Sequence, residues 1–400
     1  MLDPNPTTAN KRKSSEADRR PSHRAERRAR FGCVALLLQG GGALGAYQAG
    51  VYQALDEADL VPDWLAGISI GAINSALIAG NPREKRIDRL RSFWEAITTP
   101  FLPDLSGLGL ASLLDNQAAR GALLDVSAAS ALWRGQPGFF TPRIPPPWFT
   151  LPGAPGPTSF YDTAELRTTL ERLVDFDRIN ARETRFSVAA VNVKSGNFVY
   201  FDNARHRIGP EHIVASGSLP PGFPATEIDG ELYWDGGLIS NTPLQWLLDN
   251  ARECDTLAFQ VDLWSARGKP PRNLAEVAVR QKEIQYSSRT RAMTDVVKST
   301  QKFRCAVARL LAKLPPDLLD DPEVAELRPL VCTQSLNIVH LIYRAKSYEN
   351  QAKDYEFSRL SMRDHWRAGY EDAMRSLSKS AIFEPAARTL GVKTFDFGAV

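Results

Sequence analysis

Ser69 has the neighbours that a catalytic nucleophile needs. It is the centre of Gly67-Ile68-Ser69-Ile70-Gly71, between a short apolar run and a run of helix-forming residues. A chain that turns sharply from strand to helix needs small residues beside the serine, and the turn exposes the serine Oγ at the helix N-terminus. The partial positive charge there favours developing negative charge. Because Gly and Ser also meet by chance in many turns, the assignment depends on an oxyanion hole and a base elsewhere in the chain.

A glycine-rich segment that precedes the serine could hold an oxyanion. Gly40-Gly41-Gly42-Ala43-Leu44-Gly45 follows a strand-like run and precedes a helical one. The Gly-x-Gly-x-x-Gly spacing also fits a dinucleotide-binding loop, but that loop wants an acidic residue after the second strand, where this chain has its serine. Consecutive glycines let backbone N–H groups point at one spot, and each such donor stabilises a tetrahedral intermediate by roughly 3 kcal/mol. The candidate donors are Gly40, Gly41, Gly42 and Gly45.

Asp235 is the best-placed base. It ends the strand-like run 232–234 and precedes Gly236 and Gly237, so its carboxylate stands at a tight turn. A carboxylate can take the serine proton directly if the two groups are within hydrogen-bonding distance. The histidines are less well placed; they are His23, His206, His212, His340 and His365. A core position is the simpler interpretation of His340, and a triad of Ser69, Asp235 and His340 is the alternative.

Alternating elements position these residues. Residues 33–38 form an apolar run typical of a strand buried on both faces, and residues 46–55 are helical. Residues 61–66 predict the next strand and residues 72–79 the next helix. This alternation predicts an α/β fold with a parallel sheet and helices on its faces. Further strands are predicted at 186–193 and 198–201, joined as a hairpin, and at 257–263, which we expect to be the last strand of the sheet.

Three segments lie outside the alternation. Residues 1–30 are polar and basic, which predicts a disordered tail that solubilises the chain or tethers it to anionic lipid. Residues 98–160 are rich in Pro, Gly and aromatic residues, which favours either a lid that faces lipid or packing over the sheet edge. Residues 266–400 are mostly helical, and a long helix there should pack on the catalytic domain of residues 31–265. The apolar face of that helix is predicted to contain Tyr348, Tyr355, Met362, Trp366, Tyr370 and Met374.

Composition excludes several classes of function. Residues 1–30 carry nine Lys/Arg and four acidic residues, so the rest of the chain has a net charge of about −2 and is no basic nucleic-acid binder. The four cysteines form no Cys-x-x-Cys pair, so neither a disulfide framework nor a metal site is predicted. A signal peptide and a run of the roughly 18 apolar residues that span a membrane are both missing. These features predict a cytoplasmic, soluble protein with peripheral membrane contact at most, and they leave its oligomeric state open.

Together these motifs resemble the patatin-like phospholipase family. The glycine-rich segment, the serine motif and residues 215–220 (Ala-Ser-Gly-Ser-Leu-Pro) are similar to three motifs of the family. Asp235-Gly236-Gly237, followed by Asn241 and Pro243, is similar to a fourth. The four occur in family order between about residues 33 and 265. Leu44 is a departure, because many members carry Arg or Lys at that position. The later part of the chain resembles a bacterial subgroup with an additional C-terminal domain.

The resemblance implies a three-layer α/β/α fold with a mainly parallel sheet. It implies a dyad of Ser69 as nucleophile and Asp235 as base, with Gly41, Gly42 and their neighbours as the oxyanion hole. The implied activity is hydrolysis of fatty-acyl esters of lipids without metal or cofactor. Lipid headgroup, acyl length, positional preference and the balance with acyl transfer stay open. A non-catalytic module that binds a nucleotide or a lipid is the alternative from another class.

Overall fold

The computed structural model describes residues 28, 30–98, 116–151, 158–251, 254–287, 290–332, 334–346, 348–349 and 352–398. The predicted tail lies outside the described residues except for residues 28 and 30. Residues 99–115 and 152–157 of the predicted lid segment also lie outside them. Within the described ranges, every helix is too short or too polar to cross a membrane.

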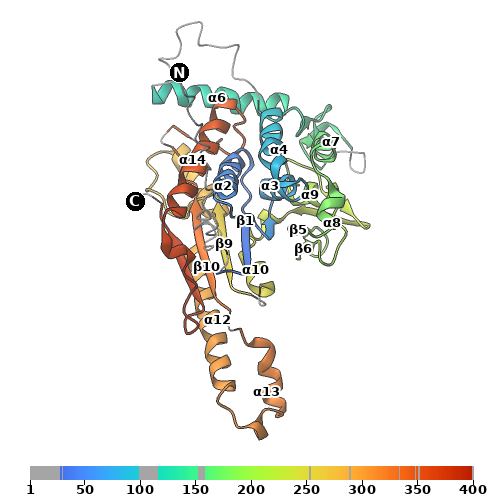
Figure 1. Ribbon diagram of the computed structural model, residues 1–400. Coiled ribbons are helices and arrows are strands. Elements are labelled where there is room, and N and C mark those ends of the chain that lie inside the picture. The colour runs from blue at the N-terminus through green and yellow to red at the C-terminus, as the bar shows by residue number, and fades with distance from the viewer. Residues whose placement is uncertain are drawn as a thin grey trace, which may run out of the picture.

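One mixed sheet forms the centre of the protein (Figure 1), and within the described residues it has nine strands. Strand β6 (Phe198–Asp202) pairs with β5 alone. The pairs from β11 to β5 are parallel, whereas β6, β7 and β8 pair antiparallel. The sheet is therefore mainly parallel, as predicted. The other strands lie side by side in the order β11 (Val392–Asp396), β10 (Leu336–Ile342), β9 (Thr256–Asp262), β1 (Cys33–Leu38), β2 (Trp64–Gly67), β5 (Arg185–Asn192), β8 (Glu231–Asp235) and β7 (Thr226–Ile228).

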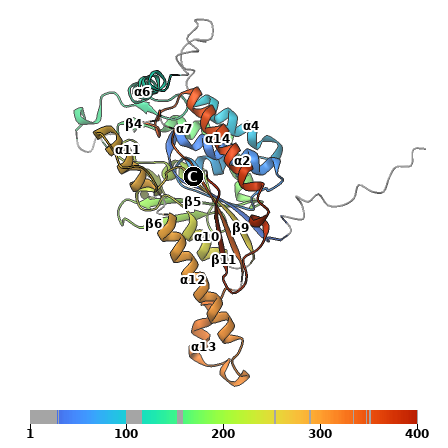
Figure 2. The ribbon, with the colours of Figure 1, turned by 90° about the vertical axis from the view of Figure 1, so that its left-hand side faces the viewer.

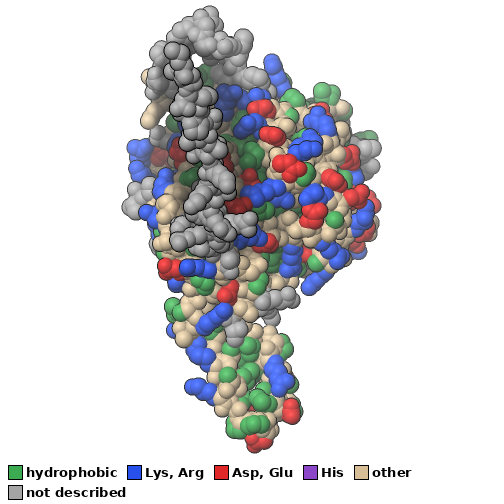
Figure 3. Space-filling model, in the orientation of Figure 1, with side chains coloured by type: hydrophobic (Ala, Val, Ile, Leu, Met, Phe, Trp, Pro, Cys, Tyr) green, Lys and Arg blue, Asp and Glu red, His purple; other side chains and the backbone are tan. Residues whose placement is uncertain are grey.

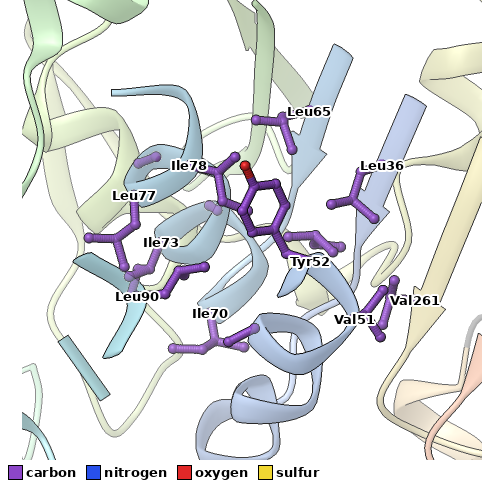
Figure 4. Packing of buried hydrophobic residues seen from close by; sticks show 14 of the residues in the cluster. Leu36, Val51, Tyr52, Leu65, Ile70, Ile73, Leu77, Ile78, Leu90 and Val261 are labelled. Atoms are coloured by element: carbon purple, nitrogen blue, oxygen red, sulfur yellow. The ribbon is translucent and has the colours of Figure 1, made fainter. Parts of the chain in front are cut away.

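Helices cover both faces of this sheet. Successive side chains of a strand point to opposite faces, so a strand that is apolar throughout needs a hydrophobic core on each side. Leu36 and Leu38 of β1 join the larger hydrophobic core, which Figure 4 shows in part. Ala35 and Leu37 join the smaller core on the other face. The larger core contains side chains of α2 (Ala46–Glu57), α3 (Ile70–Ala79), α4 (Arg83–Ala96) and α14 (Arg359–Leu377). The smaller core contains side chains of α10 (Leu244–Asn250) and α12 (Thr290–Leu311).

Shorter elements surround the three layers. Helix α6 and strand β3 belong to the predicted lid segment of residues 98–160, and β4, which pairs with β3, directly follows that segment. Helices α11 and α13 belong to the C-terminal region. The remaining helices are α6 (Gln117–Arg134), α7 (Ala164–Leu173), α8 (Phe176–Asn180), α9 (Pro210–Ser216), α11 (Leu274–Tyr286) and α13 (Pro322–Leu327). The two short strands are β3 (Thr141–Pro142) and β4 (Tyr161–Asp162). The 3-10 turns are η1 (Gly42–Gly45), η3 (Pro147–Phe149), η4 (Gly236–Leu238), η5 (Pro316–Leu318), η6 (Arg328–Leu330) and η7 (Ser380–Phe383).

The C-terminal region corrects one prediction and confirms another. The expectation that residues 257–263 form the last strand is wrong, because β10 pairs with β9 and β11 pairs with β10. The domain boundary predicted at residue 265 stays a prediction, and the parts on either side of it share this sheet. The predicted long helix is α14, which begins too late to include Tyr348 or Tyr355. It packs on α2, where Trp366 Nε1 donates to Gln53 Oε1 at 2.7 Å.

Close contact between α14 and α2 depends on glycine. A Cβ on Gly50 of α2 would overlap the Trp366 carbonyl, and one on Gly369 of α14 would overlap the Tyr47 carbonyl.

Helices α12 and α13 project from the end of the molecule that lies away from α2 and α14 (Figures 1 and 2). Figure 3 shows hydrophobic side chains on this projection, while positive and negative side chains are interspersed on the body. Phe303 and Leu310 are among its exposed side chains.

Candidate active site

The ends of two neighbouring strands bring the glycine-rich segment and the serine together. In the parallel pair β1 and β2, Leu38 lies opposite Gly67. The segments that follow both strands therefore leave the sheet at the same edge. A Cβ on Gly40 would lie 3.0 Å from Ser69 Cβ. The sequence order strand, glycine loop, helix, strand, serine thus becomes a side-by-side arrangement in space.

Ser69 occupies a sharp turn that only its glycine neighbours permit. It caps α3 with φ 55° and ψ −125°, a strained conformation for a residue with a side chain. A Cβ on Gly67 would overlap the carbonyl oxygen of Gly71, and one on Gly71 would overlap that of Leu38. The turn is also held by Ser216, whose Oγ accepts a hydrogen bond of 3.0 Å from the Ser69 N–H. These contacts fix the direction of the serine side chain.

Asp235 reaches Ser69 from the other side of β2. It ends β8, which pairs with β5, and only 2% of its surface is exposed. Its Oδ1 accepts a hydrogen bond of 2.7 Å from the Gly237 N–H. Burial raises the pKa of Asp235 to about 7, against the opposing effects of hydrogen bonds from the Ser69 hydroxyl and the Gly237 N–H. A carboxylate with such a pKa can both accept and return a proton near neutrality.

The residues of the glycine loop differ in the hydrogen bonds that their backbone groups make. The Gly40 N–H donates to Asn241 Oδ1 at 3.1 Å, and the Gly40 carbonyl accepts from Asn241 Nδ2 and Trp264 Nε1, both at 3.1 Å. Gly40 is therefore tied back into the protein. Among the hydrogen bonds of the described residues, none uses the N–H of Gly41 or Gly42. Those two groups are the ones free to bind an oxyanion.

Gly45 has a packing role in this structure. A Cβ there would lie 2.5 Å from Ile70 Cγ1 and 3.0 Å from Trp94 Cζ2. It thus allows η1 to pack against the start of α3 behind the nucleophile. Gly236 lies against the Ala189 backbone at 2.9 Å by the same measure, which places it under the turn that contains Asp235. Both glycines shape the site without facing the reacting group.

Two family profiles match this chain. One, described as patatin-like phospholipase, covers residues 36–248, which is more than half of the chain. The chain belongs to the patatin-like phospholipase family. A second profile, described as patatin phospholipase, covers residues 284–389. It spans α12, α13, β10 and α14, so the C-terminal region of this patatin-like protein has a profile of its own.

Similar proteins cover short parts of this chain. It is 32% identical over 111 residues to the triacylglycerol lipase ptl3 of Schizosaccharomyces pombe, which covers 28% of this chain and 23% of the relative. It is 51% identical over 57 residues to the lysophospholipase nte1 of Aspergillus terreus, which covers 14% and 4%. The chain therefore spans less than a quarter of the length of these curated relatives. The crystal structure of VipD from Legionella pneumophila shares 13% identity and a TM-score of 0.37, over 86% of this chain and 66% of that one.

The alternative triad of the patatin-like protein lacks its histidine. His340 is buried on β10, and β9 and β1 lie between it and the strand that leads to Ser69. Burial lowers the pKa of His340, and the acidic neighbours that counteract this effect are Asp262 and Asp396. Within the part of the chain that the structure describes, no contact joins His340 to Ser69 or Asp235. Of the two candidate bases, Asp235 is the one whose pKa is affected by the Ser69 side chain.

Sequence reasoning missed Gln39, which organises the base of the glycine loop. Its side chain is fully buried, and its Oε1 accepts from the backbone N–H groups of Leu263 and Trp264 at 2.6 and 3.1 Å. Its Nε2 donates to the Tyr286 carbonyl at 3.1 Å. A glutamine directly after an apolar strand was the available signal, because a buried amide must find partners for all its polar groups. Trp264 gave no comparable signal, whereas Ser216 belongs to the motif at residues 215–220, although its contact with the Ser69 N–H was not predicted.

The described part of the predicted lid segment combines a buried cluster with an exposed tip. Phe139 and Phe140 pack against Phe223 and Phe357, with ring centroids 5.3 to 6.2 Å apart. At the tip, Trp148 and Phe149 of η3 are 69% and 75% exposed. Both proposed roles therefore find support within this segment, because one part packs on the domain and another faces solvent.

Among the described residues, no group of His, Cys, Asp and Glu is arranged to hold a metal ion.

Proposed function

We propose that this patatin-like protein is a serine acyl hydrolase that cleaves fatty-acyl esters of lipids through a dyad of Ser69 and Asp235. The observation that carries the proposal is the arrangement of the buried Asp235 carboxylate, whose pKa the Ser69 side chain lowers, and of two unused N–H groups in the glycine loop beside Ser69. The names of the relatives, a triacylglycerol lipase and a lysophospholipase, support lipid acyl esters as the substrate class. Leu44 is fully buried in the core, so no cation at that position selects a phosphate headgroup.

The first half-reaction forms an acyl-enzyme. Ser69 Oγ attacks the ester carbonyl while its proton moves to Asp235, and the oxyanion that forms accepts hydrogen bonds from Gly41 and Gly42. When the C–O bond to the alcohol breaks, Asp235 returns the proton to the leaving oxygen. The alcohol part of the lipid departs, and the acyl group stays on Ser69.

The second half-reaction releases the fatty acid. Asp235 accepts a proton from a water molecule, which attacks the acyl carbonyl and forms a second oxyanion at the same N–H groups. Collapse of this intermediate breaks the bond to Ser69 Oγ, and the proton on Asp235 returns to the serine. The enzyme is then in its starting state, with water and ester converted to acid and alcohol.

Ser69→Ala should abolish hydrolysis of a medium-chain p-nitrophenyl ester and labelling by a fluorophosphonate. Loss of the nucleophile removes the covalent route and is expected to lower kcat by at least about ten-thousand-fold. Ser75→Ala is the matched control, because Ser75 is a buried serine of the same helix whose Oγ has no partner among the described residues. It should keep wild-type turnover. Activity that survives Ser69→Ala, or an inactive wild-type protein that co-sediments with liposomes, would overturn the proposal.

We also propose that the tip of the lid segment contacts the lipid surface. Phe160 connects this tip to the loop between α9 and β7, because its ring lies 5.4 Å from Trp148 and its N–H donates to the Pro221 carbonyl at 3.0 Å. The loop before Pro221 contains Ser218, whose carbonyl accepts from the Asp235 N–H at 3.0 Å. Exposed Trp and Phe side chains suit a membrane interface, because both rings bury apolar area in lipid and the Trp N–H can stay hydrogen-bonded at the wet boundary.

The double variant Trp148→Ser and Phe149→Ser should bind vesicles of phosphatidylcholine and phosphatidylglycerol at least about tenfold more weakly in co-sedimentation. Each buried aromatic side chain contributes about 1.5–3 kcal/mol. Hydrolysis of a water-soluble short-chain ester should stay at the wild-type rate. Leu274→Ser, which changes an 87% exposed residue at the start of α11, is the control. Equal vesicle binding by all three proteins would contradict contact through the tip.

A further inference from the structure

Two backbone carbonyls of the C-terminal region reach the glycine loop. The Tyr286 carbonyl, at the end of α11, accepts hydrogen bonds from Gln39 Nε2 at 3.1 Å and Asn241 Nδ2 at 3.0 Å. The Asp354 carbonyl accepts one of 2.8 Å from the Ala43 N–H. Gln39 begins the loop and Ala43 lies inside it, so the two carbonyls hold the loop on both sides of Gly41 and Gly42. Among the described residues, the N–H groups of these two glycines have no hydrogen-bond partner.

The contact with Asp354 leaves no room for a side chain on Gly42. A Cβ on Gly42, which has φ +55°, would overlap the Asp354 carbonyl oxygen. The Tyr286 contact acts through Asn241, which binds both the N–H and the carbonyl of Gly40. A shift of either carbonyl would therefore change the direction of the Gly41 and Gly42 N–H groups. Their usefulness depends on direction, because a donor stabilises an oxyanion only from the right position.

Two ion pairs join the segments that supply these carbonyls. Lys282 of α11 binds both carboxylate oxygens of Asp354, at 2.7 and 2.8 Å. Lys353, the residue before Asp354, binds Glu283 Oε1 at 2.8 Å, and only 4% of its side chain is exposed. Breaking a buried pair destabilises its surroundings, and here Glu283 would keep one other partner, Arg280, whose Nη1 lies 3.1 Å from Glu283 Oε2. The buried Lys353–Glu283 pair therefore fixes the spacing between α11 and residues 352–358.

The same segment is anchored to the rest of the C-terminal region. Glu349 accepts hydrogen bonds from Tyr343, which follows β10, at 2.6 and 2.8 Å. Its Oε1 also lies 2.8 Å from Nε2 of His365, which belongs to α14. Helices α11 and α14 lie at the same end of the molecule, opposite the projection of α12 and α13 (Figure 2). Glu349, three residues before the segment 352–358, thus contacts both the residue that follows β10 and the helix that packs on α2.

We propose that the C-terminal region completes the oxyanion hole by acting as a carbonyl clamp, which we define as the Tyr286 and Asp354 carbonyls with the pairs Lys282–Asp354 and Lys353–Glu283. The clamp rests on the proposed serine hydrolase function. Lys353 and Glu283 are positioning residues, since they act on the oxyanion through the backbone of the loop. The clamp gives the part of the chain covered by the second family profile a direct part in turnover.

The test compares an oxygen ester with the matching thionoester, whose sulfur is a poor hydrogen-bond acceptor. Lys353→Met should lower kcat for the oxygen ester about tenfold, with KM changed less than about twofold, because misplaced groups lose rate at constant binding. The ratio of oxygen ester to thionoester turnover should fall by a similar factor. Glu283→Gln should act in the same direction, and Lys353→Arg should restore most of the ratio. Titration of Ser69 with a fluorophosphonate normalises kcat to folded enzyme.

Arg388→Met is the control for a general loss of stability. It breaks an ion pair of 2.6 Å with Asp255 that also joins the C-terminal region to the sheet, away from the glycine loop. It should lower the melting temperature and leave the ester ratio at the wild-type value. If Lys353→Met does not fold, Lys282→Met, which removes the more exposed pair, should lower the ratio by a few-fold. An unchanged ratio in the folded clamp variants would overturn the clamp, whereas an inactive wild-type protein would overturn the proposed function instead.

Discussion

Asp235→Asn should lower kcat for ester hydrolysis by about a hundred- to ten-thousand-fold, the range that a general base contributes. The amide oxygen can still accept a hydrogen bond from Gly237, whose N–H binds Asp235 Oδ1 at 2.7 Å. It cannot take the proton of Ser69, so the nucleophile stays a hydroxyl. Steady-state assays on a p-nitrophenyl ester measure this loss. Turnover equal to the wild-type rate would contradict the role of Asp235 as base.

The pH profile of the wild-type enzyme tests the same residue without a mutation. Burial raises the pKa of Asp235 to about 7, while the hydrogen bonds from Ser69 and Gly237 oppose the shift, and Tyr286 is a further titratable group facing it. Because only the ionised carboxylate accepts a proton, kcat/KM should rise with pH through about 7 and then level off. An acid limb with a midpoint near 4 would contradict a buried base.

The same pKa shift predicts that the buried Asp235 carboxylate lowers the stability of the folded protein. A folded pKa above the unfolded value of 3.8 means that the folded state binds more protons between pH 4 and 7, so stability falls as pH rises. About three pKa units correspond to roughly 4 kcal/mol. Asp235→Asn should therefore melt at a higher temperature than wild type at pH 8, with a difference that shrinks toward pH 4.

Asp255→Asn is the matched control with the opposite sign. Although burial alone would raise the pKa of Asp255, hydrogen bonds from the Ser335 N–H and Arg388 lower it. Its contribution is therefore stabilising above the unfolded pKa and is lost as pH falls through the folded pKa. This variant should melt below wild type at pH 8. A lower melting temperature for both variants would show that the cost of burying Asp235 is compensated elsewhere.

The positions of Ser69 and Asp235 could be predicted because each residue has glycine neighbours in the sequence that indicate a tight turn. Ser69 and Asp235 each stand at a turn that only small neighbours allow, and both turns follow strand-like runs. The α/β fold followed from the same local alternation. The hairpin of β5 and β6 was also predictable, because Gly196 with φ +72° lies between two apolar runs. Local chemistry decides these features, so the sequence contains them.

The rest depends on groups that are distant in sequence or lie in the backbone. Which glycines are free donors depends on Asn241, which takes the Gly40 N–H from 201 residues away. The place of β10 beside β9 depends on topology, and its apolar run fits a buried strand or a helix segment equally well. The contact between Ala43 and the Asp354 carbonyl uses main-chain atoms alone. Residue types give no sign of such a contact.

Gly42→Ala should lower kcat by at least about a hundredfold, close to the loss of an oxyanion-hole donor. The substitution meets two obstacles. An alanine strains a φ of +55°, at about 1 kcal/mol, and its Cβ would overlap the Asp354 carbonyl oxygen. We expect this overlap to push the glycine loop and residues 352–358 apart and so to change the direction of the Gly41 and Gly42 N–H groups. Steady-state kinetics and thermal melting measure the two effects separately.

Gly230→Ala separates backbone strain from this displacement. Gly230 has φ +82° in the turn between β7 and β8, and a Cβ there would meet nothing within 4 Å. It should therefore lose about 1 kcal/mol of stability and keep wild-type kcat. If Gly42→Ala behaves like this control, neither the close contact with Asp354 nor the direction of the Gly42 N–H matters for turnover. A large loss of kcat at Gly42 alone means that backbone strain, which both glycines share, is not the cause. It would support an oxyanion hole that depends on a carbonyl more than 300 residues further along the chain, because the overlap with Asp354 occurs at Gly42 and not at Gly230.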